Sequence, residues 1–255
     1  MIFDSHAHYD DEAFDADRDE LLTSMHANGV EYILNAGEAV KSSLAGVELG
    51  KKYDFIYSAA GIHPEHDEET TDEDIAEIEK IALQNKKVRA IGEIGLDYHY
   101  EGYNKEKQIY IFKKQLEIAK KINLPVIIHS RDAAQECFDI IKESRVNMGV
   151  IHCYSGSVEM AKEYIKIGFY IGIGGVVTYK NARKLVEVAE AIPIEKIVLE
   201  TDCPYLAPSP FRGKRNNSSY IEFVAEKIAE IKGISYEKVC EITTENAKKL
   251  YDINN

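Results

Sequence analysis

Six residues of this sequence carry side chains that bind divalent cations, and each stands where an apolar run ends. They are His6, His8, Glu93, His129, His152 and Asp202. Mixed imidazole and carboxylate ligands suit transition metals such as Zn²⁺ or Mn²⁺, whereas a Mg²⁺ site ordinarily uses more oxygen. Six ligands are too many for one tetrahedral ion that must also hold water. We therefore expect two divalent cations per subunit, bridged by one carboxylate, with Zn, Mn and Mg as the candidates.

The placement of these residues is more informative than their types. In His6-Ala7-His8 the two histidines are two positions apart, so on an extended chain both imidazoles face the same side. A single histidine is more often a core or surface residue than a ligand, but four that independently end strands are hard to explain in that way. Lone His26, in an expected helix, is interpreted as structural.

Eight short apolar, β-branched runs alternate with segments of helical spacing, which predicts parallel strands joined by right-handed crossovers. The runs are Ile2–His6, Val30–Gly37, Phe55–Ile62, Val88–Gly95, Pro125–His129, Gly149–Cys153, Gly168–Gly174 and Lys196–Thr201. Helices are expected near residues 15–28, 39–52, 72–86, 105–123, 131–145, 157–167, 179–191 and 218–232, with a final helical tail from Ser235.

This pattern predicts an α/β fold, a single (β/α)8 TIM barrel over residues 1–255 with an additional C-terminal helix. Barrel enzymes build their sites at the carboxyl ends of the strands, which is where the six candidate ligands stand. The alternative is an open, doubly wound sheet. It would be favoured by a Gly-x-Gly-x-x-Gly turn after the first run, but histidines stand there instead.

Composition limits the expected partners and the expected cellular location. The formal charge of −13 disfavours a broad basic surface for gripping a duplex, although bound metals and a local cationic patch can handle a few phosphates. Four cysteines without a Cys-x-x-Cys pair are typical of a reducing cytoplasm, which is the expected location. The sequence has no signal peptide pattern and no long apolar stretch, so no membrane partner is expected. Nothing indicates an organic cofactor, and the oligomeric state is left open.

Two irregular segments flank these motifs. The acidic stretch Glu65–Glu79 is interpreted as a solvated loop and the start of a helix. The stretch Cys203–Asn217 reads as a long loop whose Arg212, Lys214 and Arg215 either contact a nucleic-acid backbone or are merely solvated.

At this point the motifs resemble those of the TatD family of metal-dependent barrels over nearly the whole chain. The segments that carry the likeness are Phe3-Asp4-Ser5-His6-Ala7-His8, Gly61-Ile62-His63-Pro64, Gly92-Glu93-Ile94-Gly95-Leu96-Asp97-Tyr98, Ile128-His129-Ser130-Arg131, His152-Cys153-Tyr154-Ser155-Gly156, Leu199-Glu200-Thr201-Asp202-Cys203-Pro204-Tyr205-Leu206 and Asn246-Ala247. One departure stands out. Relatives usually have Arg-Asn-Glu-Pro in the loop after the eighth strand, where this chain has Arg215-Asn216-Asn217-Ser218.

The resemblance implies that His6, His8, Glu93 and Asp202 surround one metal and that Glu93, His129 and His152 hold the other. It implies a deoxyribonuclease of the 3′–5′ exonuclease type, with DNA ends or single-stranded DNA as substrate. It also places His63 beside the metals, in contact with substrate.

From these residues we expect a metal-activated water to attack phosphorus, with Asp202 accepting its proton and passing it to the leaving group. Arg131 either helps to fix the phosphate or forms a salt bridge to a helix carboxylate. Tyr98, Tyr154 and Tyr205 either stack a base or pack the barrel mouth. Two other functions remain open, an amidase, esterase or lactonase acting on a small molecule, and a non-catalytic metal-binding scaffold.

Overall fold

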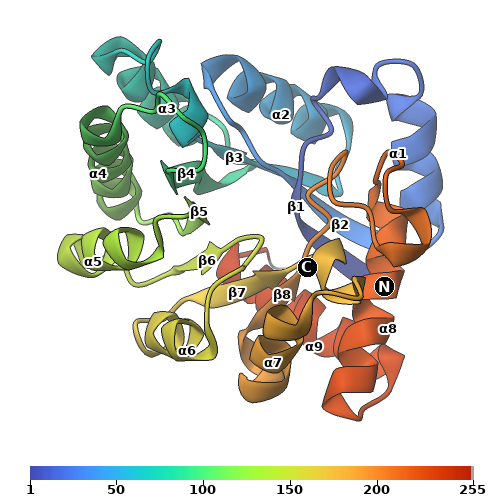
Figure 1. Ribbon diagram of the computed structural model, residues 1–255. Helices are drawn as coiled ribbons and strands as arrows, with labels where there is room; N and C mark the ends of the chain where they lie inside the picture. The colour runs from blue at the N-terminus through green and yellow to red at the C-terminus, as the bar shows by residue number, and fades with distance from the viewer. Residues whose placement is uncertain (254–255) are drawn as a thin grey trace.

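A computed structural model describes residues 1–253 and contains eight parallel strands arranged in sequence order around a barrel (Figure 1). The strands are β1 (Ile2–Ala7), β2 (Val30–Asn35), β3 (Ile56–Ala60), β4 (Val88–Asp97), β5 (Val126–Arg131), β6 (Gly149–Ile151), β7 (Tyr170–Ile173) and β8 (Ile197–Leu199). Between β8 and β1 the barrel closes through a parallel bridge that pairs Ala7 with Cys203. There the His8 amide donates to the Cys203 carbonyl at 2.8 Å. The TIM-barrel prediction is confirmed.

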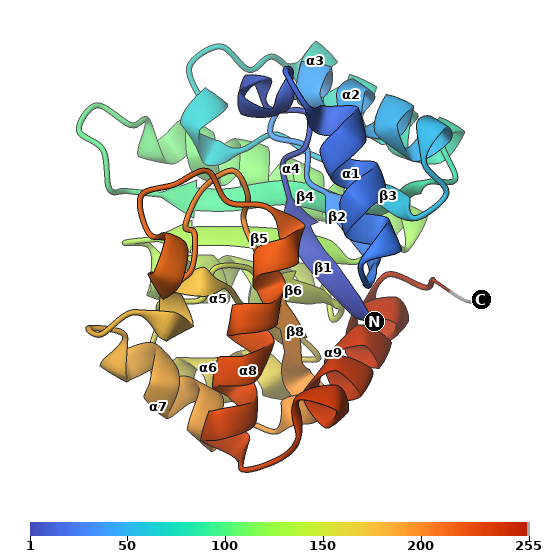
Figure 2. The ribbon, with the colours of Figure 1, turned by 90° about the vertical axis from the view of Figure 1, so that its right-hand side faces the viewer.

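Helices follow the strands and cover the outside of the barrel (Figures 1 and 2). They are α1 (Arg18–Ala27), α2 (Val40–Lys52), α3 (Asp72–Gln84), α4 (Lys105–Ile122), α5 (Ala134–Ser144), α6 (Val158–Lys166), α7 (Arg183–Ala191), α8 (Ile221–Lys232) and α9 (Tyr236–Leu250). Local sequence explains their limits. The Asn104 side chain caps the start of α4, and Asn123 ends that helix in the left-handed conformation, with φ 56°. None of the helices in the described residues is long and apolar enough to cross a membrane.

One buried side chain from each strand contributes to an inner layer of the core. These are Phe3, Leu34, Ala59, Ala90, Ile127, Val150, Tyr170 and Val198. The C-terminal helix α9 packs against β1 and β8, and Figure 2 shows it beside the N-terminal end of β1. Its Leu250 and the following Tyr251 join the inner layer, and the Tyr251 hydroxyl donates to the Ser5 carbonyl at 3.1 Å. The additional C-terminal helix therefore closes the floor of the barrel.

Strand lengths differ from the expected ones around the mouth. The strands β4 and β5 run on to Asp97 and Arg131, whereas β6 and β8 stop at Ile151 and Leu199. His152 and Asp202 consequently lie in loops just beyond their strands, and Asp202 has φ 58°. The backbone amides of His152 and Asp202 still bond to the neighbouring strands, at the carbonyls of Ile128 and His6, so the apolar runs extend past the ends of the strands.

The close approach of β4 and β5 depends on Gly95. Its φ is +150°, and a Cβ at this position would lie 1.9 Å from the carbonyl oxygen of His129. A larger residue would push apart the two strands that carry Glu93 and His129, because only glycine accepts both the conformation and the contact.

Candidate metal centre

The carboxylate of Glu93 lies at the middle of the site, and one of its oxygens faces the β1 side of the mouth. His6 Nε2 lies 3.1 Å from Glu93 Oε2 and 3.6 Å from Asp202 Oδ1. His8 Nε2 lies 3.8 Å and 3.4 Å from the same two oxygens. The two imidazole nitrogens are themselves 3.0 Å apart. Four atoms that carry electron pairs thus crowd around one point.

The other oxygen of Glu93 faces the opposite side. Glu93 Oε1 lies 2.7 Å from His152 Nε2, 2.8 Å from His129 Nδ1 and 3.5 Å from His63 Nε2. The nitrogens of His129 and His152 are 3.3 Å apart. The structure therefore brings all six predicted ligands together around Glu93, with His63 beside His129 and with His152 close to His6 and Asp202 as well. Their role as ligands stays a prediction.

Two of the imidazoles are oriented by hydrogen bonds on their far nitrogens. His129 Nε2 donates to Asp97 Oδ2 at 2.9 Å, and His8 Nδ1 donates to the Ala36 carbonyl at 3.2 Å. Each bond places the ring proton on the far nitrogen and leaves the lone pair of the other nitrogen directed into the site. Such outer partners are typical of histidines that bind a metal, because they fix the ring orientation and the tautomer.

His63 has the opposite arrangement. Its Nδ1 accepts the backbone N–H of Glu65 at 3.2 Å, so in the neutral ring the proton lies on Nε2, the atom that faces Glu93. A nitrogen that carries a proton has no lone pair for a metal. His63 is therefore better suited to donate a hydrogen bond at the edge of the site than to act as a ligand.

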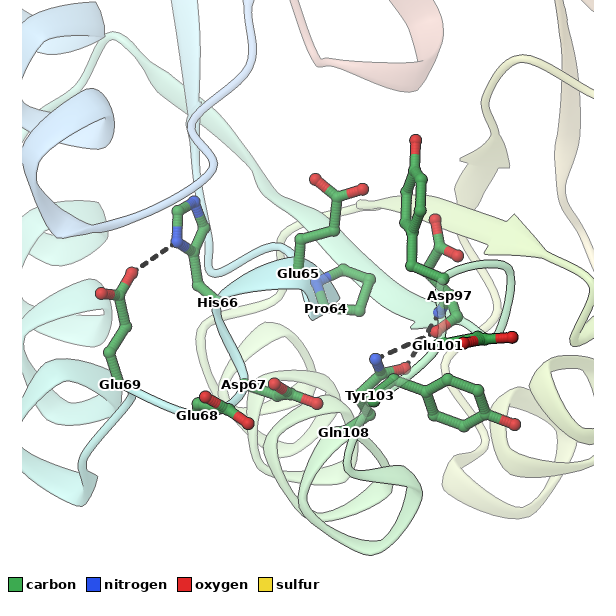
Figure 3. A pocket seen from close by; sticks show the side chains of 12 residues that line it. Pro64, Glu65, His66, Asp67, Glu68, Glu69, Asp97, Glu101, Tyr103 and Gln108 are labelled. Atoms are coloured by element: carbon green, nitrogen blue, oxygen red, sulfur yellow. Dashed lines mark hydrogen bonds and ion pairs between the residues drawn. The ribbon is translucent and has the colours of Figure 1, made fainter.

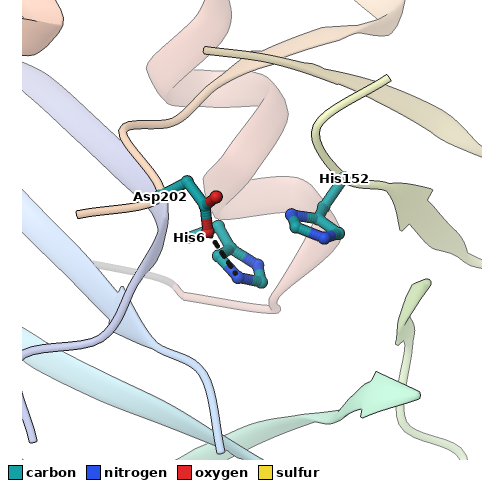
Figure 4. Close-up of side chains that lie close together, drawn as sticks. All are labelled: His6, His152 and Asp202. Atoms are coloured by element: carbon teal, nitrogen blue, oxygen red, sulfur yellow. Dashed lines mark ion pairs between the residues drawn. The ribbon is translucent and has the colours of Figure 1, made fainter. Parts of the chain in front are cut away.

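Figure 4 shows His6, His152 and Asp202, which come from three different parts of the chain and meet in the barrel mouth. The rings of His6 and His152 stack with centroids 4.1 Å apart. All three ligand atoms lie within 4.8 Å of one another. Imidazole nitrogens and carboxylate oxygens at this spacing fit a divalent cation, which satisfies several lone pairs at once.

The electrostatics keep the two carboxylates charged. Burial opposes ionisation of Glu93, but neighbouring His152 and His6 hold the pKa of its carboxyl well below its ordinary value. Burial likewise opposes the charge on Asp202, but its hydrogen bond with His8 and the charge of His152 lower its pKa. Burial also lowers the pKa of His6 to about 4, with His152 adding to the effect. Burial opposes the charge on His8 and His129, but hydrogen bonds with Asp202 and Asp97 raise the pKa of His8 to about 10 and that of His129 to about 9. A cation that binds to these imidazoles therefore displaces their protons.

A second layer of buried polar groups holds the loops that carry the site. The Asp4 carboxylate accepts from the Thr201 amide at 3.0 Å, from the Thr201 hydroxyl at 2.6 Å and from the Ser218 hydroxyl at 2.5 Å. Asn216 donates to the carbonyls of Thr201 and Tyr205. The departure at Asn217 and Ser218 therefore leaves the loop tied to β1, with Ser218 supplying one of the bonds.

The remaining predicted residues lie around the mouth. Arg131 donates from Nη1 to the Tyr100 hydroxyl at 3.1 Å. Arg215 pairs with Asp17 at 2.6 Å and lies over the ring of Phe14, 5.0 Å from its centroid. The guanidinium of Arg215 is thus engaged within the protein.

Comparison with known proteins decides the family. A family model described as TatD related DNase matches residues 3–252. The chain belongs to the TatD family. It is 45% identical to the uncharacterized metal-dependent hydrolase YabD of Bacillus subtilis (strain 168), with both chains fully covered. It is 34% identical to YcfH of Escherichia coli (strain K12), another uncharacterized metal-dependent hydrolase, over 100% of this chain and 97% of that protein.

Solved structures agree with this assignment. The crystal structure of YjjV, a TatD homolog from Escherichia coli K12, matches with a TM-score of 0.95 at 28% identity, over 99% of this chain and 98% of that one. A TatD family hydrolase from Entamoeba histolytica matches with a TM-score of 0.89 at 24% identity, which shows the shared fold. The family resemblance read from the motifs is confirmed, and at this level the chain is a metal-dependent hydrolase.

Sequence reasoning missed Asp97 as the partner of His129. A signal was present, because Asp97 stands four residues after Glu93 on β4 and an even spacing places two strand residues on the same face. It also missed Asn216 and Ser218, whose contacts with residues far away in the sequence leave no local pattern.

Proposed function

We propose that this protein is a metal-dependent deoxyribonuclease that removes nucleotides from DNA 3′ ends at a binuclear site. The observation that carries the proposal is the position of the Glu93 carboxylate, whose Oε2 faces the His6 imidazole and whose Oε1 faces the imidazoles of His129 and His152. A carboxylate in that position suits two cations held side by side, the arrangement that two-metal phosphodiesterases use. When bound, the cations supply Lewis acidity and lower the pKa of a water from 15.7 to about 7.

The chain's own residues supply the proton transfers. Asp202 Oδ1 faces His6 and His8, so its other oxygen is the one we assign to take the proton of the attacking water. The same oxygen then delivers the proton to the departing sugar hydroxyl, since a general base in one step serves as the acid in the next.

Two cationic or proton-bearing groups complete the site. The Nε2–H of His63 faces the site beside Glu93, and we assign it to donate to a phosphoryl oxygen. Arg131 stands two residues after His129 on β5, and we assign its guanidinium to hold the phosphate through charge-assisted hydrogen bonds.

The test begins with purified protein stripped of metal. Mg²⁺, Mn²⁺ or Zn²⁺ is added back separately, and a short end-labelled single-stranded DNA is followed beside a panel of simple esters and amides. We expect metal-restored shortening of the DNA from its 3′ end, abolished in Glu93→Ala. DNA that stays intact while an ester or amide is hydrolysed would move the substrate to the small-molecule class.

A further inference from the structure

Two exposed tyrosines stand on opposite sides of the barrel mouth. Tyr205 follows β8 and Tyr100 follows β4, and both are 53% exposed. The strands are paired in sequence order around the barrel, so β4 and β8 are half a turn apart. The two rings therefore lie on opposite sides of the mouth, Tyr205 beside His8 and Tyr100 beside Arg131.

On the β8 side, Tyr205 is fixed close to the ligands. Its ring lies edge-on to His8 with centroids 6.5 Å apart. Its hydroxyl donates to Asp11 Oδ2 at 2.9 Å, and its carbonyl accepts from Asn216 at 2.7 Å. Both ends of the residue are tied, so the exposed ring is held in one orientation without being covered.

On the β4 side, Tyr100 is coupled to Arg131. The guanidinium donates to the Tyr100 hydroxyl at 3.1 Å, and its carbon lies 5.0 Å from the ring centroid. Arg131 follows His129 on the same strand, so this contact connects Tyr100 to the second group of ligands.

Other tyrosines near the mouth are already used in packing. The rings of Tyr98 and Tyr103 stack with centroids 4.8 Å apart. Tyr154 is only 5% exposed, and its hydroxyl donates to the Ser157 carbonyl. Of the three tyrosines considered from the sequence, Tyr205 is the one with a ring face available for a ligand.

Beside Tyr100 lies a cavity of about 500 Å³ whose lining has six carboxylates and no lysine or arginine (Figure 3). The acidic residues are Glu65, Asp67, Glu68, Glu69, Asp97 and Glu101. Asp97 joins the cavity to the metal centre through its bond to His129. A phosphate on this side would meet like charge, whereas an uncharged nucleoside would not.

We propose that Tyr205 and Tyr100 are stacking platforms for the two bases that flank the scissile phosphate, and that the Tyr100 side accepts the terminal nucleoside. This inference rests on the proposed function and adds to it the reason for acting at chain ends. The terminal nucleoside brings no further phosphate to the acidic cavity. The rest of the DNA strand extends away from the site across the Tyr205 ring.

The test compares Tyr205→Ala and Tyr100→Ala with the matched Tyr→Phe variants and with Tyr110→Ala. Tyr110 is an exposed tyrosine of α4 that bonds to Asp72, away from the mouth. The substrates are a short single-stranded DNA and the same strand with abasic residues at its last two 3′ positions. Each Tyr→Ala variant should lose about tenfold in kcat/KM on the normal strand, the size of one stacking contact. On the abasic strand it should lose nothing further. Tyr205→Phe keeps the ring but loses the bond to Asp11, so it should lose less than Tyr205→Ala, and Tyr110→Ala should match the wild type.

Equal losses on both strands would overturn the stacking role. A Tyr100→Phe variant as slow as Tyr100→Ala would also overturn it, because Tyr100 would then act only through the bond from Arg131 to its hydroxyl. Wild-type enzyme that cuts both strands at equal rates would overturn this inference alone. Wild-type enzyme that cuts neither would overturn the proposed function and this inference with it.

A 3′-phosphate on the normal strand tests the acidic side. It should slow removal of the last nucleotide by about tenfold, and a Glu68→Gln/Glu101→Gln variant should recover most of that loss. Equal rates with and without the phosphate would overturn the assignment of the terminal nucleoside to the Tyr100 side.

Discussion

The two ends of the barrel contain different types of side chain. At the floor, apolar side chains of α9 and the residues after it pack on Phe3 and its neighbours, and the Tyr251 hydroxyl has a carbonyl partner. At the mouth, four histidines and two carboxylates lie within a few ångström of one another, in loops and strand ends tied by buried polar bonds. From this difference we infer that the residues that stabilise the fold lie at the floor and that the residues that perform the chemistry lie at the mouth. Changes at one end should leave the other property intact.

The largest effect should come from Asp202→Asn at the mouth. The amide cannot take a proton, so single-turnover cleavage of DNA should fall by about 10²- to 10⁴-fold. The thermal midpoint and most of the bound metal should be retained. A near-normal cleavage rate in this variant would remove Asp202 from the proton transfer.

At the floor, Tyr251→Ala should lower the free energy of unfolding by about 3–5 kcal/mol, because it leaves a cavity where a fully buried ring packs. The kcat per folded molecule should stay unchanged. Chemical denaturation measures the first quantity and DNA cleavage the second. The control is Tyr236→Ala, at a partly exposed tyrosine that begins α9. A loss of kcat with little loss of stability would break the separation between the two ends.

Asp97→Ala should show an intermediate effect, again at the mouth. Without the bond to His129 Nε2, metal affinity should fall by about 10- to 100-fold, as for other outer partners of ligand histidines. Asp97→Asn should lie between this variant and the wild type. Isothermal titration with Mn²⁺ measures the change, and Asp132→Ala, an exposed acid of the mouth, should have no effect. Unchanged affinity in Asp97→Ala would show that His129 is held without it.

The smallest effect should come from Arg215→Ala. Its guanidinium is engaged with Asp17 and the Phe14 ring, so the KM for DNA should stay within about twofold of the wild type. The Tm should fall by no more than about 3 °C, since exposed ion pairs contribute little. A KM raised tenfold would instead place Arg215 on the nucleic-acid backbone.

The barrel and the ligand cluster could be predicted from the sequence because both follow from periodic patterns. Alternating strand and helix segments predicted the order of the elements, and ligands at strand ends such as His129 meet at one end of a parallel barrel. The limits of the strands were less well predicted. Asp202 lies in a loop beyond β8 with a positive φ, a geometry that no hydrophobic pattern reports.

The supporting contacts were out of reach for a different reason. Ser218 bonds to Asp4 across 214 residues of sequence, and Tyr251 closes the floor against Ser5 across 246. Such pairs depend on the complete fold and not on local spacing. Asp97 is the exception, since its even spacing from Glu93 on one strand already placed both on the same face.

The central claim is that Glu93 lies between two cation sites, and metal stoichiometry tests it most directly. Protein stripped of metal is titrated with Mn²⁺ or Zn²⁺, and bound metal per chain is measured after removal of the free ion. We expect two equivalents of metal per chain in the wild type and a loss of binding at both sites in Glu93→Ala. Circular dichroism should show that the variant keeps its fold. One equivalent in the wild type, or two in Glu93→Ala, would contradict the account.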